Sequence, residues 1–377
     1  MKVKKLFLTM VTTAAYICTL CNTNVFAEKN NNLSLQNEKS CKIQEIVDAL
    51  RNSKEGIPSS VSQDDIDFII NEGGEEGLEA LEYIYSISRP VEEVLSEMTI
   101  DRKTKVSNHY SYSYDVETSE VLFDSGEKYD YEPVVNKKEG IKKSTLKGLN
   151  SNVSNYAFPY DWYEPDPQNY DNTRSTCKLT IVTSSGATYK GSGFLIANNY
   201  VGTAGHCLYA DAYGSNKWCA YVIVTPSANV GSNPNPYGTC RSLNHEVGGN
   251  WYDHYQYDDD WGIIQLNKSY SIGYMGLMAP GNDIYNWGVR AQGWRTDGNG
   301  NMYLCRGSIT SASDRIVYIS SDVYHGMSGG PLIEDRDYII GFVRAYTYPD
   351  PNSNPGHGPG EIVKFDNWLF NKMASYR

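Results

Sequence analysis

The sequence lacks an excess of basic residues, and after its first 27 residues it lacks a long apolar run. Among 377 residues, 33 are Lys or Arg and 45 are Asp or Glu, which gives a net charge of −12 at pH 7. A nucleic-acid-binding protein needs a basic face to neutralise phosphates, and a membrane-spanning helix needs ~20 apolar residues. The composition therefore argues against nucleic acid as a partner, and against a membrane once the first segment is removed.

Cysteine is scarce and is not spaced for metal binding. Of eight cysteines, two lie in the first 27 residues and one, Cys41, lies in the amino-terminal third. The remaining five are Cys177, Cys207, Cys219, Cys240 and Cys305. No two of these stand two to four residues apart, the spacing typical of zinc sites, so we expect neither a metal nor another cofactor. An oxidising compartment permits disulfides, and a bond from Cys207 to Cys219 or to Cys240 would brace the loop behind His206, but the sequence does not choose the pairing. The odd count leaves one free thiol or an unusual partner.

The first 27 residues have the pattern of a secretory signal peptide. Three lysines among the first five residues precede an apolar stretch over residues 6–20, and Val25-Phe26-Ala27 forms a cleavage site. A membrane anchor is the alternative, but the stretch is interrupted by Thr12 and Thr13 and is too short to span a bilayer. We therefore expect a signal peptide over residues 1–27 and a secreted, extracellular protein.

Residues 28–150 differ in character from the rest of the chain. They hold more than half of the carboxylates and no tryptophan. Ser62, with Asp65 three residues later and an apolar stripe behind it, predicts the start of a helix. Aromatic and β-branched residues between 110 and 135 indicate strands, and a segment containing lysine and glycine, residues 137–148, indicates an exposed linker. We predict a small α+β unit here.

From about residue 151 the chain consists of short apolar runs separated by Gly, Asn, Pro and Ser. Examples of these runs are 179–182, 193–196, 220–224 and 338–343. Many short strands with turn signals between them are typical of a β-barrel or a sandwich. Residues 365–373 predict the one clear helix of this region.

His206 is the first of three residues with a catalytic pattern. It lies in Thr203-Ala204-Gly205-His206-Cys207, after an apolar strand end, where small residues let the backbone pass close to a catalytic side chain. A lone histidine is usually structural, but this motif is specific. The other histidines of the second region lack such a setting: His245, His254, His325 and His357. We predict that His206 is the general base.

Asp260 and Ser328 supply the other two catalytic groups. Asp260 ends a run of three aspartates, whose default interpretation is a solvated loop, but an apolar strand over 261–266 follows it directly. At the mouth of a buried strand, its carboxylate can orient the histidine and stabilise the imidazolium. Ser328 lies in a glycine-rich turn that would expose its hydroxyl and point the backbone N–H groups of Gly326 and Ser328 at a developing oxyanion.

The order of these residues along the chain distinguishes two hydrolase folds. His, then Asp, then Ser is the order in chymotrypsin-fold proteases. The serine motif also satisfies Gly-x-Ser-x-Gly, the nucleophile elbow of α/β-hydrolases. That fold needs a helix directly after the serine, which Pro331 disfavours, and an Asp and a His downstream, where only Asp350 and His357 stand in a loop rich in Pro, Asn and Gly. The chymotrypsin-fold hypothesis is therefore preferred.

Residues from about 155 to 377 resemble the bacterial glutamyl endopeptidase branch of the chymotrypsin-fold serine proteases. The resemblance rests on the motifs around His206 and Ser328 and on Ser192-Gly193-Phe194-Leu195-Ile196. It implies a mostly β protease domain over residues 151–377, with two antiparallel six-stranded β-barrels, the site between them and a C-terminal helix. It also implies that residues 28–150 are a propeptide, with an independent accessory domain as the alternative.

Departures from that branch leave activation and substrate preference open. Met327 replaces the aspartate that captures the new amino terminus in animal trypsins, so activation must work differently. Glutamate-specific relatives carry a histidine two residues after the glycine that matches Gly341, where this chain has Val343 followed by Arg344. Asp322 stands where trypsin-like enzymes place the acid that recognises Arg or Lys; the alternative is that Asp322 is hydrogen-bonded or paired with Arg344.

The sequence thus predicts a secreted serine endopeptidase that is made as a zymogen and hydrolyses peptide bonds through an acyl-enzyme. Its expected partners are protein or peptide substrates, its own propeptide, and either an activating protease or a second copy in self-processing, with cleavage between residues 143 and 155. The rival hypothesis is a catalytically silent homologue that serves as a binding or adhesion module. The three intact catalytic positions favour the enzyme.

Overall fold

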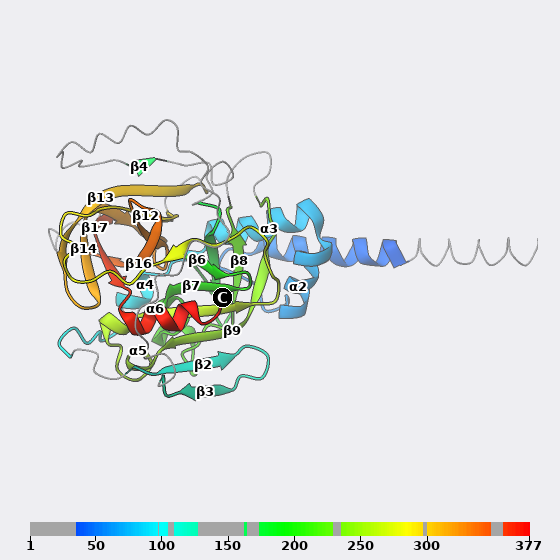
Figure 1. Cartoon of the computed structure of the whole chain (residues 1–377). Coiled ribbons are helices and arrows are strands. Elements are labelled where there is room, and N and C mark those ends of the chain that lie inside the picture. Colours follow the sequence, from blue (N-terminus) through cyan, green and yellow to red (C-terminus); the bar gives the residue numbers. More distant parts are fainter. Residues whose placement is uncertain are drawn as a thin grey trace, which may run out of the picture.

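The computed structural model describes residues 35–96, 98–104, 109–126, 173–228, 235–296, 300–347 and 357–377, and the backbone of residues 162–163. The expected signal peptide, the expected linker and the expected cleavage region between 143 and 155 lie outside the described residues. Two β-barrels and an N-terminal group of helices are seen in the described part (Figure 1).

The first barrel consists of six antiparallel strands. These are β5 (Thr176–Val182), β6 (Thr188–Ala197), β7 (Tyr200–Ala204), β8 (Tyr221–Pro226), β9 (Cys240–Gly248) and β10 (Trp261–Leu266). They pair in the order β10-β7-β6-β5-β8-β9, and β9 pairs back to β10, which closes the barrel. In β5 the alternate residues Cys177, Leu179 and Ile181 are completely buried, because the two-residue period of a strand turns one face to the core.

The second barrel also has six antiparallel strands. These are β12 (Gly288–Trp294), β13 (Met302–Ala312), β14 (Ile316–Tyr324), β15 (Pro331–Glu334), β16 (Tyr338–Tyr346) and β17 (His357–Lys364). They pair in the order β16-β15-β12-β13-β14-β17, and β17 closes on β16. Two short strands add to it, since β11 (Gly276–Leu277) pairs with β16 and β4 (Trp162–Tyr163) pairs with β13.

The chain ends in the helix α6 (Asn367–Ala374), whose N-cap Asp366 accepts a hydrogen bond from the N–H of Leu369 at 2.7 Å. Short helices and 3₁₀ turns connect the barrel strands: η2 (Gly205–Cys207), η3 (Asp211–Tyr213), α5 (Gly249–His254) and η4 (Tyr257–Asp259). The predicted fold, two closed antiparallel six-stranded barrels followed by a C-terminal helix, is confirmed.

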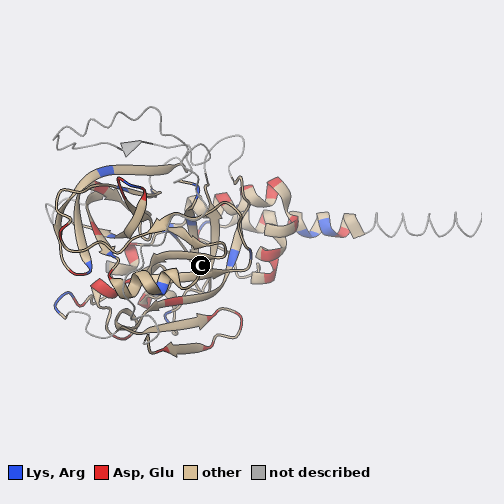
Figure 2. Cartoon of the chain, viewed as in Figure 1, with Lys and Arg blue, Asp and Glu red and all other residues tan. Residues whose placement is uncertain are grey.

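The N-terminal region contains both helices and strands. A helix covers residues 35–52. It is followed by α2 (Gln63–Glu72), α3 (Gly74–Ile87), β1 (Arg89–Pro90), α4 (Glu93–Ser96), β2 (Ser111–Asp115) and β3 (Val121–Asp124). The predicted helix start is confirmed, because Ser62 and Asp65 form a reciprocal capping box at α2. Figure 2 shows acidic residues, in red, along these N-terminal helices.

The N-terminal region packs on the first barrel and extends its sheet. Strand β2 pairs antiparallel with β9, and β1 pairs parallel with β6. Ion pairs also join the helices of this region to the barrel. Arg241 in β9 pairs with Asp67 of α2 at 2.9 Å, and the buried Lys178 of β5 pairs with Glu82 of α3. In the described part of the chain, no helix is long and apolar enough to cross a membrane.

All six cysteines outside the expected signal peptide are described, and all are free thiols. The structure therefore does not contain the disulfide considered for Cys207. The Sγ atom of Cys207 lies 3.7 Å from the backbone oxygen of Ser328, whereas the Sγ atom of Cys219 lies 3.5 Å from Nδ1 of His245. The two thiols thus contact different partners in the barrel core.

Candidate active site

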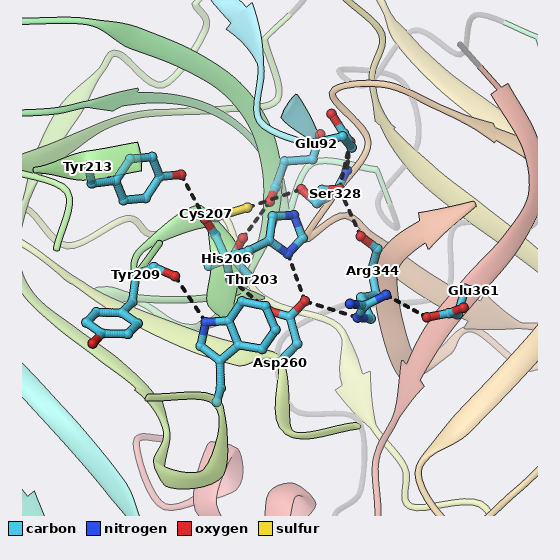
Figure 3. Close-up of polar contacts among 12 residues, drawn as sticks. Glu92, Thr203, His206, Cys207, Tyr209, Tyr213, Asp260, Ser328, Arg344 and Glu361 are labelled. Atoms are coloured by element: carbon cyan, nitrogen blue, oxygen red, sulfur yellow. Dashed lines mark hydrogen bonds and ion pairs between the residues drawn. The ribbon is translucent and has the colours of Figure 1, made fainter. Parts of the chain in front are cut away.

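His206 lies in η2, directly after β7, and Asp260 directly precedes β10. Strands β7 and β10 are neighbours, and Ala204 pairs with Trp261, so the sheet register brings the two side chains together. The backbone N–H of His206 donates to Oδ1 of Asp260 at 2.7 Å, and Nδ1 of its ring lies 2.9 Å from Oδ2 (Figure 3). Both side chains are completely buried. This arrangement fixes the ring and leaves Nε2 as the atom able to exchange a proton.

The aspartates before Asp260 have other partners. Asp259 accepts from Arg315 at 2.8 Å and from the indole N–H of Trp261 at 2.9 Å, and it is almost completely buried. A buried carboxylate needs such partners to offset its lost hydration. Of the three consecutive aspartates, Asp260 is the one that contacts His206, as the sequence predicted.

Ser328 lies in the turn between β14 and β15, at the edge of the second barrel. Two glycines of the turn have left-handed backbone conformations, Gly326 with φ +92° and Gly329 with φ +84°. A side chain at Gly329 would also place its Cβ only 2.0 Å from Oγ1 of Thr203 in the first barrel. Glycine is required there both for the turn and for the close approach of the two barrels.

The backbone N–H groups of Gly326 and Ser328 converge on one acceptor, the carboxylate of Glu92. Gly326 donates to Oε1 and Oε2 at 2.9 Å each, and Ser328 donates to Oε1 at 3.3 Å. The hydroxyl of Ser328 also donates to Oε1, at 2.6 Å (Figure 3). The two N–H groups predicted to hold an oxyanion therefore do point at a common negatively charged group, and this group belongs to the N-terminal region.

Nucleophile and base are not joined in this arrangement. Oγ of Ser328 has Glu92 and, at 3.1 Å, the backbone oxygen of Arg344 as its acceptors. Among the described residues, Nε2 of His206 is buried without a hydrogen-bond partner. A serine hydroxyl becomes a nucleophile when a base takes its proton, so the geometry is that of an unactivated site.

The segment before Glu92 lies along β6. The N–H of Val91 donates to the backbone oxygen of Lys190 at 3.1 Å, and the hydroxyl of Ser88 donates to Oγ1 of Thr188 at 2.7 Å. Sequence reasoning did not identify Glu92, because nothing local distinguishes it from the many other carboxylates of that region. The only signal that could have found it is its position after Pro90, where the helical pattern ends.

Arg344 lies behind Asp260 instead of in a substrate pocket. Its Nε is 3.2 Å from Oδ2 of Asp260, its Nη1 donates to Oε1 of Glu361 at 2.6 Å, and the side chain is 1% exposed. Of the alternative that Asp322 is hydrogen-bonded or paired with Arg344, the pairing with Arg344 is not found, but Asp322 does have a hydrogen-bonding partner. Asp322 instead lies 2.9 Å from Nδ1 of His357, and both of these side chains are partly exposed. Val343 is buried in the core of the second barrel.

Cys207 directly follows His206 in the chain and also has a nucleophilic side chain, but its thiol is not activated. It is completely buried, and this burial raises the pKa of its thiol far above the ordinary value. A thiol is reactive as the thiolate, so Cys207 is a structural residue next to the site. The described residues contain no group of three or more His, Cys, Asp or Glu side chains placed to hold a metal ion.

Residues 191–342 match the family model of the trypsin-like peptidase domain. The extracellular metalloprotease of Bacillus subtilis (strain 168) is 30% identical over 175 residues, which cover 42% of this chain and 51% of that protein. The glutamyl endopeptidase of Bacillus licheniformis is 27% identical over 166 residues, which cover 43% of this chain and 51% of that protein. The chain thus spans about half the length of the curated relatives it matches.

Two solved structures are also similar. One of a Glu endopeptidase in complex with MPD has a TM-score of 0.47 and 20% identity, covering 57% of this chain and 95% of that chain. The protease Anisep from Arthrobacter nicotinovorans has a TM-score of 0.45 and 18% identity, covering 57% of this chain and 99% of that chain. The fold assignment itself rests on the strand pairings of the two barrels.

Two closed six-stranded barrels, with a buried His-Asp pair from the first and a glycine-rich serine turn from the second, form a chymotrypsin-like fold, and residues 191–342 are similar to trypsin-like peptidase domains. Among the curated proteins, the chain is similar to a glutamyl endopeptidase.

Proposed function

We propose that this chain is a secreted serine endopeptidase made as a zymogen, with a signal peptide over residues 1–27, a propeptide over 28–150 and a protease domain over 151–377. The observation that carries the proposal is the buried pair of His206 and Asp260 next to a turn whose two N–H groups and hydroxyl converge on one point. Acyl transfer needs these three functions: a base, a nucleophile and an oxyanion site.

The proposed reaction follows from these groups. When a substrate carbonyl replaces the Glu92 carboxylate, Nε2 of His206 takes the proton of Ser328 Oγ, and this oxygen attacks the carbonyl carbon. The N–H groups of Gly326 and Ser328 donate to the oxyanion, and Asp260 stabilises the imidazolium. The imidazolium then gives its proton to the leaving amine. Water, deprotonated by His206, hydrolyses the acyl-enzyme and regenerates Ser328.

Burial of the site supports the zymogen proposal. His206 and Ser328 are both completely buried, and Glu92, from the N-terminal region, contacts the nucleophile directly. A protein substrate needs a free path to Ser328, so the N-terminal region must leave the site before catalysis. Cleavage between residues 143 and 155, by another protease or by self-processing, would break the covalent link between the two regions.

The proposed substrates are proteins or peptides. Of the three specificity residues predicted from sequence, Asp322 remains the proposed one, whereas Val343 lies in the core of the second barrel and Arg344 lies behind Asp260. The pairing of Asp322 with His357 weakens the case for a basic preference, because a paired carboxylate attracts a substrate cation less than a free one. A peptide library with varied residues before the scissile bond distinguishes the hypotheses. Cleavage confined to Arg and Lys, weakened by Asp322→Ala, supports the basic pocket; cleavage confined to Glu and Asp contradicts it.

The function is tested by Ser328→Ala in the processed protein. We expect loss of peptide hydrolysis by about 10⁶-fold, because the nucleophile is removed, and loss of covalent labelling by a fluorophosphonate. Ser321→Ala, a change in the same strand-turn region, serves as a control that keeps both activities. Retained turnover in Ser328→Ala would contradict the assignment, and a processed wild-type protein that is folded but never labelled would support the silent binding module instead.

A further inference from the structure

A row of buried ionisable side chains continues behind His206 and Asp260 and reaches Glu361, which in the unprocessed chain also pairs with the exposed Arg102 at 3.1 Å. The Oδ2 atom of Asp260 faces both Nδ1 of His206, at 2.9 Å, and Nε of Arg344, at 3.2 Å. Arg344 in turn donates to Glu361 in β17 at 2.6 Å. All four side chains of the row are at most 1% exposed, so solvent does not screen their interactions (Figure 3).

We propose that Arg344 is a positioning residue for catalysis, which orients Asp260 and sets how readily His206 accepts a proton. This inference rests on the proposed function. The guanidinium lies 3.2 Å from Oδ2 as an ion pair without a hydrogen bond, so it holds the carboxylate through its charge. Its positive charge also opposes a second positive charge on the imidazole, and the negative charge of Glu361 partly offsets that effect.

Few other groups can influence His206. Cys207 adjoins it in η2, where burial keeps the thiol neutral, and the hydroxyl of Tyr213 donates to the backbone oxygen of His206 at 2.7 Å. Tyr257 in η4 lies over Arg344, with its ring centre 5.6 Å from Cζ. Glu92 faces the site only before processing. In the processed protein, the charges near His206 are therefore those of Asp260, Arg344 and Glu361.

The test is the rate of fluorophosphonate labelling of Ser328 as a function of pH in the processed protein, which does not require the peptide preference to be known. Glu361→Gln leaves the positive charge of Arg344 uncompensated, so the acid limb of the profile is expected to move down by at least about 0.5 pH unit. Arg344→Met combined with Glu361→Gln removes both charges and is expected to move the limb up by at least about 0.5 pH unit.

Two further variants serve as controls. Arg344→Lys keeps the charge, so its acid limb is expected to stay near that of the wild type, and Arg306→Met removes a charge on β13 outside this row. Opposite shifts in the first two variants support the proposal. An unmoved limb in both, with only slower labelling, would show a purely structural role and overturn it. A wild-type protein that is never labelled would instead contradict the proposed function.

A separate observation concerns how Glu92 occupies the site. Its side chain is 7% exposed and lies 4.0 Å from the ring of His325, while its two oxygens accept from two backbone N–H groups and one hydroxyl. Donors of this kind are arranged for the negative oxygen that develops during acyl transfer. The carboxylate supplies that negative charge before any substrate arrives.

The segment that leads into Glu92 is anchored on β6. Val91 is completely buried and bonds to the backbone of Lys190, and the hydroxyl of Ser88 bonds to Thr188. In addition, Nζ of Lys190 donates to the backbone oxygen of Ser86 at 3.0 Å. These contacts fix the backbone next to Glu92, so its side chain is held in the site at a low cost in conformational entropy.

We infer that Glu92 is an inhibitory residue, which keeps the unprocessed chain inactive in two ways. It fills the oxyanion site, and it accepts a hydrogen bond from the hydroxyl of Ser328. This deepens the proposed function. A side-chain carboxylate presents no peptide bond and no amine leaving group, so attack by Ser328 would lead to no cleavage. The same contact directs the hydroxyl of Ser328 to Glu92, so Nε2 of His206 receives no hydrogen bond from this hydroxyl.

The test compares fluorophosphonate labelling of the unprocessed, full-length chain, with gel analysis to confirm that it stays intact. Glu92→Ala is expected to be labelled at least about 10-fold faster than the wild type, because the oxyanion site is vacated. Glu92→Gln keeps the shape but loses the charge, and is expected to give an intermediate rate. Glu93→Gln, at the exposed neighbouring carboxylate, is the matched control and is expected to match the wild type, while Ser328→Ala is not labelled.

The labelling rates of these variants are compared with that of the processed wild-type protein. If that protein is labelled rapidly while Glu92→Ala and Glu92→Gln, both folded by circular dichroism, are labelled no faster than the intact wild type, the inhibitory role is overturned. If no protein is labelled, including the processed wild type, the proposed function fails instead.

Discussion

His206 and His245 are both completely buried in the first barrel, yet their neighbours suit them to different tasks. His206 has the carboxylate of Asp260 at its ring. His245 has the hydroxyl of Ser242 at 2.9 Å and the thiol of Cys219 at 3.5 Å. Burial, together with the positive charge of Arg241, lowers the pKa of His245 to about 3. His245 therefore stays neutral at physiological pH and is a packing residue.

This burial predicts a pH dependence of stability. The folded state keeps His245 neutral down to about pH 3, whereas the unfolded chain takes up a proton near pH 6.5. The unfolded state thus binds more protons between these values, so stability is lost as the pH falls through that window. In urea unfolding, the wild type is expected to lose about 2–3 kcal/mol more than His245→Gln between pH 7 and pH 4.5. Equal losses would contradict this.

At the scale of elements, local signals and long-range pairing contribute differently. The helix α2 begins at a capping box that its own residues complete, Ser62 with Asp65. The short strand β1, by contrast, has only two residues and pairs with β6 about 100 positions later in the chain. Such a strand has no stability of its own, and its place is fixed by the barrel against which it lies.

The capping box of α2 gives an element-scale prediction. Ser62→Ala removes the acceptor for the N–H of Asp65 and is expected to cost about 1 kcal/mol of stability in the N-terminal region. Thermal unfolding of the full-length chain measures this change. Ser60→Ala, at an exposed position just before the helix, is the control and is expected to change little. Equal effects of the two substitutions would contradict the capping role.

At the scale of the whole molecule, the N-terminal region is joined to the protease barrels by a sheet and by buried charges. Residues 111–115 of β2 pair with 244–248 of β9. Three lysines or arginines of the barrel region pair with acidic residues of the N-terminal region: Lys178 with Glu82, Arg241 with Asp67, and Lys372 with Asp124. Each basic side chain is at most 6% exposed, and a buried charge that loses its partner is costly.

Cleavage of the linker alone is therefore expected to leave the two pieces associated. After cleavage between 143 and 155, size-exclusion chromatography should show both pieces eluting together, and labelling of Ser328 should stay slow until the N-terminal piece is degraded. Asp67→Asn with Glu82→Gln, which leaves Lys178 without its carboxylate partner and Arg241 with the longer 3.8 Å pair to Glu117, is expected to promote dissociation. Immediate separation of the wild-type pieces would contradict this prediction.

The sequence by itself determined many of the elements and predicted the reaction class. Short apolar runs such as 179–182 stand between turn residues and indicate strands, and Ser62 with Asp65 marks a helix start. The motifs around His206 and Ser328 are also local, so each of these features can be recognised from neighbouring residues. The contact of Asp260 with His206 also followed from sequence, because the aspartate directly precedes a buried strand.

Only the tertiary structure decided how the site is filled and supported. Glu92 and Ser328 are 236 positions apart, and Arg344 meets Asp260 and Glu361 only because β16, β17 and the loop before β10 converge. The disulfide considered for Cys207 is not found for the same reason, since the directions of Cys207 and Cys219 depend on the barrel around them. Local sequence patterns report the structural propensity of a segment. The partner of a carboxylate or a guanidinium has no such local pattern, because the packing of distant elements decides which charged groups meet.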